Sequence, residues 1–295
     1  MCKKVCITGV YGLLGQNLVK VFSSAGYDIS GIDLLSEPQP QEGLKEYFIA
    51  DITDEKTIAP LLKSINPDVF INTAALTNVD LCETERAKAE ALNGLAVGYM
   101  AAALPSSCRF VQISTDYVFD GVAGPYNDDS PVNPISWYGA TKLMGEEAVR
   151  NCRKDGLIIR TMVLIGRIKG LKPDFIHFIK SSLESGKAIK IVTDQVGNVT
   201  LASNLAANIK CAVELGITGT MAVAGSERIS RYDFALKVAE RYNLDKYLIS
   251  PILTADLKQP AKRPLSSGFT FNRAKEFREI KLLTVDQMMT EYDNE

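Results

Sequence analysis

Residues 5–24, VCITGVYGLLGQNLVKVFSS, decide the fold of this chain. The short β-branched run at 5–8 is typical of a buried strand, and the amphipathic pattern at 13–24 predicts a helix. A glycine-rich turn between a strand and a helix lets the backbone approach a pyrophosphate, which the helix N-terminus attracts. The stretch therefore predicts a dinucleotide site. The residues expected to contact the cofactor there are Gly9, Tyr11, Gly12, Leu13, Leu14 and Gly15.

An acidic residue ends the next predicted strand, which covers 29–33. Asp33 lies 24 positions after Gly9, close to the spacing of about 20 residues at which an acid hydrogen-bonds the adenosine ribose. Because no Lys or Arg lies near Asp33 to balance a 2′-phosphate, the local charge favours NADH over NADPH. Asp51 and Ile52 follow a third strand, where they would contact adenine or cap a helix. The residues alone leave both alternatives open.

The first half of the chain alternates apolar strands with amphipathic helices. We expect further strands at 68–72, 109–114 and 157–161, and helices at 57–65, 84–104 and 136–154. Strands joined by ten or more helical residues imply right-handed crossovers and a mostly parallel sheet. The predicted fold class is therefore α/β: a Rossmann-type doubly wound parallel sheet with a smaller, interleaved C-terminal substrate lobe.

The regular alternation of predicted strands and helices ends at about residue 161. Longer loops separate helices expected at 174–185, 201–215 and 231–242, and the tail carries Pro251, Pro260 and Pro264. We therefore expect two domains. The dinucleotide-binding domain takes residues 1–161 with about 195–225, and the substrate-binding lobe takes 162–194 and 226–295.

Tyr138 and Lys142 lie four residues apart in a predicted helix, which places both side chains on one face. An ammonium beside the phenol would lower the tyrosine pKa and prepare it for proton transfer. The preceding strand ends in Ser114 and Thr115. Successive strand residues point to opposite faces, so only one of these two is expected to face a ligand. After a glycine loop, this arrangement favours a catalytic site over a solvated helix face.

Composition excludes several other classes of protein. The 33 basic and 35 acidic residues give a net charge of −2, so we expect no nucleic-acid partner. With a single histidine, His177, a Ser-His-Asp triad or a multi-histidine metal site would have to be built around that residue, and the absence of a Cys-x-x-Cys pair argues against a zinc clip. Whether a divalent metal assists stays open. No apolar run approaches the roughly 18 residues of a membrane span. We therefore expect a cytoplasmic protein that does not contact membranes.

Longer motifs resemble those of the extended short-chain dehydrogenase/reductases, and within them the dTDP-4-dehydrorhamnose reductases. The stretches that carry the resemblance are TGVYGLLG at 8–15, NTAALTNVDLCETE at 72–85, STDYVFDG at 114–121, SPVNPISWYGATKLMGE at 130–146, IIRT at 158–161, TDQVGNVT at 193–200, and the Lys-Arg-Pro run at 262–264. Together these motifs are distributed over nearly the whole chain. STDYVFDG and WYGATKLMGE are specific, whereas the whole superfamily shares the glycine loop.

The resemblance implies that NADH or NADPH reduces the C4 keto group of a nucleotide-linked 4-keto-6-deoxy sugar. It implies that Thr115 and Tyr138 hydrogen-bond the sugar carbonyl, with Tyr138 as the proton donor. Lys142 would hold the nicotinamide ribose, and Ala74 and Ala75 would lie along the cofactor. The substrate contacts that it implies are Asp116 and Tyr117 near the sugar and Arg263 near the phosphates.

Three positions depart from the pattern of these reductases. Met162–Val163 stands where they usually carry Ser-Trp, and Val199 stands where they usually carry proline. All three positions line the sugar-nucleotide site of the family. The sequence therefore leaves open the nucleotide, the sugar and the product stereochemistry. It also leaves open whether the protein is a homodimer.

Two alternative functions also stay open. The chain is similar to the regulatory β subunit of methionine adenosyltransferase, which is not an enzyme; the stretch 228–252 favours it, whereas 194–197 favours the reductases. A sugar-nucleotide dehydratase or epimerase is the other alternative. Dehydratases place an Asp-Glu pair after the threonine, where this chain has Asp116-Tyr117.

Overall fold

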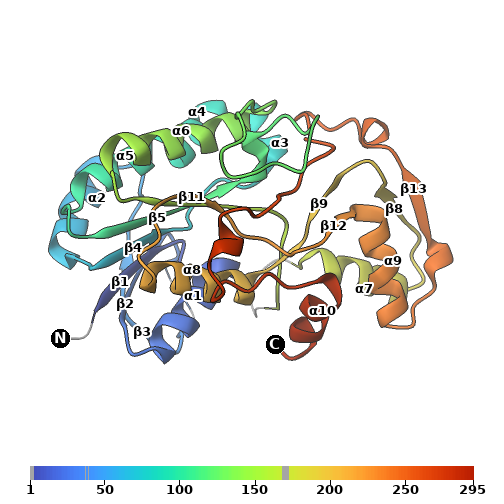
Figure 1. Cartoon of the computed structure of the whole chain (residues 1–295), viewed down its shortest axis with the longest axis horizontal. Helices are drawn as coiled ribbons and strands as arrows, with labels where there is room; N and C mark the ends of the chain where they lie inside the picture. The colour runs from blue at the N-terminus through green and yellow to red at the C-terminus, as the bar shows by residue number, and fades with distance from the viewer. Residues whose placement is uncertain (1–2, 37, 39, 168–172) are drawn as a thin grey trace.

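A seven-stranded parallel sheet forms the centre of the molecule (Figure 1). The structure, a computed structural model, describes residues 3–36, 38, 40–167 and 173–295. In chain order the strands are β1 (Lys4–Thr8), β2 (Asp28–Asp33), β3 (Leu44–Ile49), β4 (Val69–Asn72), β5 (Arg109–Thr115), β6 (Leu157–Thr161) and β11 (Gly219–Ala222). Their spatial order is β11-β6-β5-β4-β1-β2-β3. The order reverses at β1, which confirms the doubly wound sheet and places a ligand crevice at the carboxyl ends of β1 and β4.

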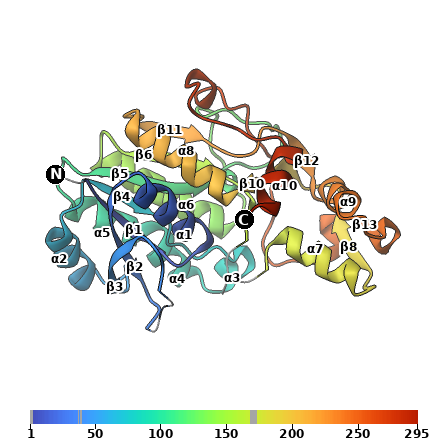
Figure 2. The ribbon, with the colours of Figure 1, turned by 90° about the horizontal axis from the view of Figure 1, so that it is seen from below.

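Helices cover both faces of the sheet (Figures 1 and 2). One face carries α1 (Leu13–Ser24) and α8 (Ala202–Glu214), which pack against each other. The other carries α2 (Glu55–Ile65), α5 (Ala96–Ala103) and α6 (Trp137–Cys152). Strands such as β4 and β6 are buried along their whole length, because both faces are covered.

The helix expected over 84–104 is interrupted. A separate short helix, α3 (Val79–Thr84), ends first, and then α4 (Arg86–Glu90) leads through a π-helical turn at Ala91–Leu95 into α5. The turn buries Asn93, whose amide donates to the Leu76 carbonyl at 3.1 Å and accepts from the Leu76 N–H at 2.8 Å. Apolar periodicity does not reveal such a turn. The expected start at 84 was also wrong, because α3 ends at Thr84 and α4 begins at Arg86.

A second group of elements packs around its own core at the carboxyl edge of the sheet (Figure 1). Its helices are α7 (Phe175–Glu184), α9 (Arg231–Arg241) and α10 (Val285–Asp293). Its strand pairs are β7 (Leu164–Ile165) with β10 (Thr200–Leu201), β9 (Val196–Asn198) with β12 (Arg228–Ser230), and β8 (Ile189–Val192) with β13 (Ile249–Ile252). Sequence periodicity missed these strands, which have only two to four residues, and it missed α10. Within the described ranges, no helix is both long and apolar enough to cross a bilayer.

Candidate active site

A cavity of about 830 Å³ opens between the carboxyl ends of the sheet strands and the β9–α9 region. It is lined by most of the residues that the sequence singled out: Gly9, Tyr11, Gly12, Leu13, Leu14, Asp33, Asp51, Ile52, Ala74, Ala75, Thr115, Asp116, Tyr117, Tyr138 and Lys142. Gly15 and Arg263 are not among the described lining residues. Two candidate groups, the glycine loop and the Tyr-Lys pair, thus share one cavity although they lie far apart in the sequence.

The glycine loop is closely packed against its surroundings. Gly9 adopts φ +64°, and a Cβ there would lie 2.8 Å from Thr73 Oγ1. A Cβ on Gly15 would lie 2.3 Å from the carbonyl oxygen of Gly9, so Gly15 allows α1 to pack against the loop and does not face the cavity. Gly12 is the N-cap of α1, and among the described side chains none caps this end. The first N–H groups of α1 are therefore available to an anion.

Asp33 connects the end of β2 to the glycine loop. Its Oδ2 accepts from the Tyr11 N–H at 3.0 Å, and its Oδ1 accepts from the Leu34 N–H at 2.8 Å. Asp51, for which adenine contact and helix capping were both open, lines the cavity, while Asp54 caps α2 by accepting from the Lys56 N–H at 3.1 Å. The capping alternative for Asp51 was therefore wrong.

Tyr138 and Lys142 lie in the first half of α6, and the Ser136 side chain caps the helix. Lys142 is 4 % exposed, and its Nζ donates to the carbonyl oxygen of Ile113 at 2.7 Å. Burial lowers the pKa of Lys142 to about 8, against the opposing charge of Glu146. Burial raises the pKa of Tyr138, against a hydrogen bond with Thr115. The expected lowering of the Tyr138 pKa by Lys142 was therefore wrong, because burial outweighs every stabilising contact.

The hydroxyls at the end of β5 point to different partners. Ser114 and Thr115 both line the cavity, but the Ser114 Oγ donates to Glu146 Oε1 at 2.5 Å. The Thr115 hydroxyl accepts from the Tyr117 N–H at 3.2 Å and donates to Asp116 Oδ1 at 3.1 Å, and its proximity to Tyr138 acts to lower the pKa of that phenol. Of the two side chains, Thr115 is therefore the one that accompanies the phenol.

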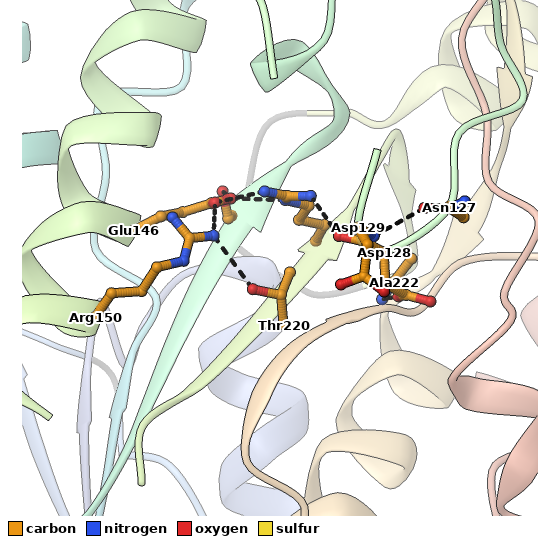
Figure 3. Close-up of polar contacts among 9 residues, drawn as sticks. Asn127, Asp128, Asp129, Glu146, Arg150, Thr220 and Ala222 are labelled. Atoms are coloured by element: carbon orange, nitrogen blue, oxygen red, sulfur yellow. Dashed lines mark hydrogen bonds and ion pairs between the residues drawn. The ribbon is translucent and has the colours of Figure 1, made fainter. Parts of the chain in front are cut away.

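Glu146 is the centre of a buried charge network (Figure 3). Arg160 contacts it twice, with Nε at 2.9 Å from Oε1 and Nη2 at 2.7 Å from Oε2. Arg150 also donates to Oε2 at 2.7 Å. These cations hold the pKa of Glu146 below its usual range although the side chain is fully buried. The residue four positions after Lys142 thus stays negatively charged.

The same network reaches the far edge of the sheet (Figure 3). Arg160 Nη1 donates to the Asp128 carbonyl oxygen at 3.1 Å, and Asp128 Oδ1 accepts from the Ala222 N–H of β11 at 2.6 Å. The loop that contains Asp128 is therefore fastened to β6 and β11. Of these residues, sequence reasoning singled out only Ser114, because the partners come from separate elements.

Asp116 and Tyr117 follow β5 into the cavity. Asp116 is 2 % exposed and accepts from the Ser267 hydroxyl at 2.7 Å; burial nevertheless raises its pKa to about 6. The ring of Tyr117 packs edge-on against Tyr138, with centroids 5.4 Å apart. Burial raises the pKa of Tyr117 to about 12. Both side chains thus lie next to the phenol that the sequence marked as catalytic.

Arg263 lies outside the cavity lining in an ion pair. Its Nη2 lies 2.8 Å from Asp80 Oδ2, and its side chain is 9 % exposed. The cavity has a different arginine, Arg231 at the start of α9, which sequence reasoning treated only as part of a helix. Met162, Val163 and Val199, the positions that depart from the reductase pattern, also line the cavity. No group of three or more His, Cys, Asp or Glu among the described residues has the arrangement of a metal site.

A doubly wound sheet, a glycine-rich β1–α1 turn and a Tyr-x-x-x-Lys pair in one cavity define an extended short-chain dehydrogenase/reductase. Within that class, the chain belongs to the family described as RmlD substrate binding domain, which it matches over residues 3–294.

Known relatives agree with this assignment. The chain is 36 % identical to a probable low-salt glycan biosynthesis reductase, Agl14, of Haloferax volcanii, over 88 % of this chain and 87 % of that one. It is 30 % identical to a dTDP-4-dehydrorhamnose reductase of Aggregatibacter actinomycetemcomitans, over 90 % and 89 %. A crystal structure of dTDP-4-dehydrorhamnose reductase from Bacillus anthracis in complex with NADP superposes with a TM-score of 0.88 at 27 % identity, covering 100 % and 99 %.

Proposed function

We propose that this protein uses NADH or NADPH to reduce the C4 keto group of a nucleotide-linked 4-keto-6-deoxy sugar. Thr115, Tyr138 and Lys142 share a cavity with the glycine loop, and this observation carries the proposal. A reductase needs a hydride donor and a proton donor at one carbonyl, and the two motifs supply sites for both. The relatives include proteins named dTDP-4-dehydrorhamnose reductase, which supports dTDP as the nucleotide of the substrate.

The residues at the β1–α1 end fit a nicotinamide dinucleotide. The uncapped N-terminus of α1 suits a pyrophosphate, and Asp33 offers a carboxylate to ribose hydroxyls. A solved relative holds NADP. When bound, the cofactor supplies the hydride. We keep the preference for NADH as a prediction from Asp33, since the only cations among the described lining residues are Lys142 and Arg231.

The chain's own residues supply the proton and the positioning. We propose that Tyr138 donates its phenolic proton to the carbonyl oxygen, and that Thr115, which lines the same cavity, holds that oxygen. A tyrosine with a raised pKa stays protonated at neutral pH and can act as an acid. Lys142 would hold the nicotinamide ribose. We propose that Asp116 and Tyr117 bind the sugar, and that the group containing α7, α9 and α10 forms the substrate lobe.

The direct test is a turnover assay with a panel of 4-keto-6-deoxy sugars linked to dTDP, UDP, GDP or CDP. NADH or NADPH consumption is followed by absorbance, and the product is identified by mass spectrometry. We expect one nucleotide sugar to be reduced with stoichiometric cofactor oxidation. A regulatory subunit would oxidise no cofactor with any of them, and an epimerase would convert its substrate without net cofactor consumption.

A further inference from the structure

Arg231 is held in place by contacts from three sides. It is the first residue of α9, which the Ser230 side chain caps. Its backbone N–H donates to the carbonyl oxygen of Gln195 at 3.0 Å. Its guanidinium carbon lies 5.5 Å from the centre of the Phe175 ring. The backbone contacts fix Arg231 at the cavity wall, and the Phe175 ring is the contact that the guanidinium itself makes.

This guanidinium has no anionic partner of its own. Among the described residues its side chain makes no hydrogen bond or ion pair, and its guanidinium lies over the Phe175 ring. Other arginines near the site are already paired, Arg160 with Glu146 and Arg263 with Asp80. Burial lowers the pKa of Arg231, which means that the environment penalises the positive charge. The nearby Asp116 and Tyr117 oppose this shift, but neither forms an ion pair with Arg231. A half-buried cation without an ion-pair partner favours an anionic ligand.

The surroundings indicate which ligand this is. Lys142, the other described cation of the lining, is already bonded to the Ile113 carbonyl and lies one helical turn from Tyr138. Arg231 belongs to the elements beyond the sheet edge, away from β1, β2 and the glycine loop (Figure 1). Arg231 interacts electrostatically with Tyr117 and Asp116, and the Tyr117 ring packs against Tyr138. An anion held there belongs to the substrate and not to the cofactor.

We propose that Arg231 binds the diphosphate of the nucleotide-sugar substrate, the role that the family resemblance assigns to Arg263. The proposal rests on the function proposed above. A planar guanidinium can bond two phosphate oxygens at once, and ring contact with Phe175 limits the freedom lost on binding. Arg263 is less suited: its buried Nη1 has no partner among the described residues, but its side chain does not belong to the described lining of the cavity, and Asp80 already neutralises much of its charge.

The test is equilibrium binding by titration calorimetry, which needs no turnover. The probes are dTDP, UDP, GDP and CDP, and the tightest of them is compared with its free nucleoside. The variants are Arg231→Ala, Arg231→Gln and Arg231→Lys, so that loss of fold in one leaves two others. Arg278→Ala is the matched control, since Arg278 is 93 % exposed and pairs only with Glu279 among the described residues. Circular dichroism and NADPH titration check fold and cofactor site.

Loss of a charge-assisted hydrogen bond corresponds to a roughly ten- to hundred-fold weaker affinity. We expect that loss for the diphosphate with Arg231→Ala and Arg231→Gln, a smaller loss with Arg231→Lys, and no change with Arg278→Ala or for the nucleoside. Arg263→Ala should weaken diphosphate binding less than Arg231→Ala. Diphosphate affinity within twofold of wild type in Arg231→Ala, or an equal loss for the nucleoside, would overturn the proposal. If wild type binds no nucleoside diphosphate and reduces no sugar, the proposed function fails as well; if it reduces one, only the role of Arg231 fails.

Discussion

The ammonium of Lys142 lies 2.7 Å from the carbonyl oxygen of Ile113, so the active-site helix α6 is fastened to β5 two residues before Thr115. Glu146, on the next turn of α6, accepts a hydrogen bond from Ser114 on the same strand. Two contacts thus hold the helix that carries Tyr138 against the strand that carries Thr115. This arrangement explains how a proton donor and its partner are positioned in advance.

Replacing Glu146 by Gln should shift the pH dependence of turnover. Burial lowers the pKa of Lys142 to about 8, while the charge of Glu146 raises it. Without the Glu146 charge the Lys142 pKa falls further, so the alkaline loss of kcat should begin at a lower pH than in wild type. The buried guanidinium of Arg160 also loses its ion-pair partner. The measurement is kcat against pH at saturating substrates.

The control is Arg150→Gln, which leaves the charge of Glu146 in place and removes only its half-exposed partner. We expect the alkaline limb of that variant to stay close to the wild-type position. Glu146→Gln with reduced activity but an unmoved alkaline limb would show that Glu146 acts only on the fold.

Replacing Asp116 by Asn should stabilise the free protein at neutral pH. Burial raises the pKa of Asp116 from 3.8 to about 6, so the folded state binds the proton more tightly than the unfolded state. The ionised carboxyl therefore costs stability above pH 6, and this cost disappears below pH 4. It amounts to on the order of 2–3 kcal/mol. Thermal unfolding of both proteins at pH 7 and pH 4 measures it.

We expect a higher melting temperature for Asp116→Asn at pH 7 and little difference at pH 4. Asp120→Asn is the comparison, because hydrogen bonds from Tyr126, Val122 and Asn133 lower the pKa of Asp120, so its loss should destabilise at pH 7. A destabilised Asp116→Asn at pH 7 would mean that the hydrogen bonds from Ser267 and Thr115 outweigh the cost of burial.

Asp33 should set the choice between the two nicotinamide cofactors. A 2′-phosphate at about 4 Å from this carboxylate would cost roughly 4 kcal/mol at an effective dielectric constant of about 20, before screening by salt. We therefore expect tighter binding of NADH than of NADPH, and a shift towards NADPH in Asp33→Asn. Fluorescence titration gives both affinities. Tighter NADPH binding by the wild-type protein would contradict this role of Asp33.

Lys142→Met should weaken cofactor binding and slow turnover together, because the proposed role of the ammonium includes both the nicotinamide ribose and the setting of Tyr138. Its loss also leaves the Ile113 carbonyl without this donor. Titration with NADH and a steady-state assay measure the two effects separately. Normal NADH affinity in a folded Lys142→Met protein would contradict the ribose contact.

Short-range sequence spacing was enough to find several of the predicted residues that the structure places in the cavity. The glycine loop, Asp33 and the Tyr138–Lys142 pair are each recognisable within one strand–helix unit, because helical and strand geometry fixes their relation. The ion pair of Arg263 with Asp80 joins residues 183 positions apart, and the Ser114–Glu146 bond spans 32. Such contacts depend on how elements pack, so no pattern in the sequence indicates them. Arg231 escaped notice for the same reason.

The measurement that tests the central claim most directly compares wild type with Tyr138→Phe on the nucleotide sugar that the panel identifies. We predict that wild type oxidises one NADH or NADPH per sugar reduced. Tyr138→Phe should lose a factor of about 10²–10⁴ in kcat, because the phenolic proton is needed in the transition state and not for holding the cofactor. Its NADH affinity should stay close to that of wild type. Absence of cofactor oxidation by wild type with every 4-keto sugar nucleotide, or a kcat for Tyr138→Phe near that of wild type, would contradict the account.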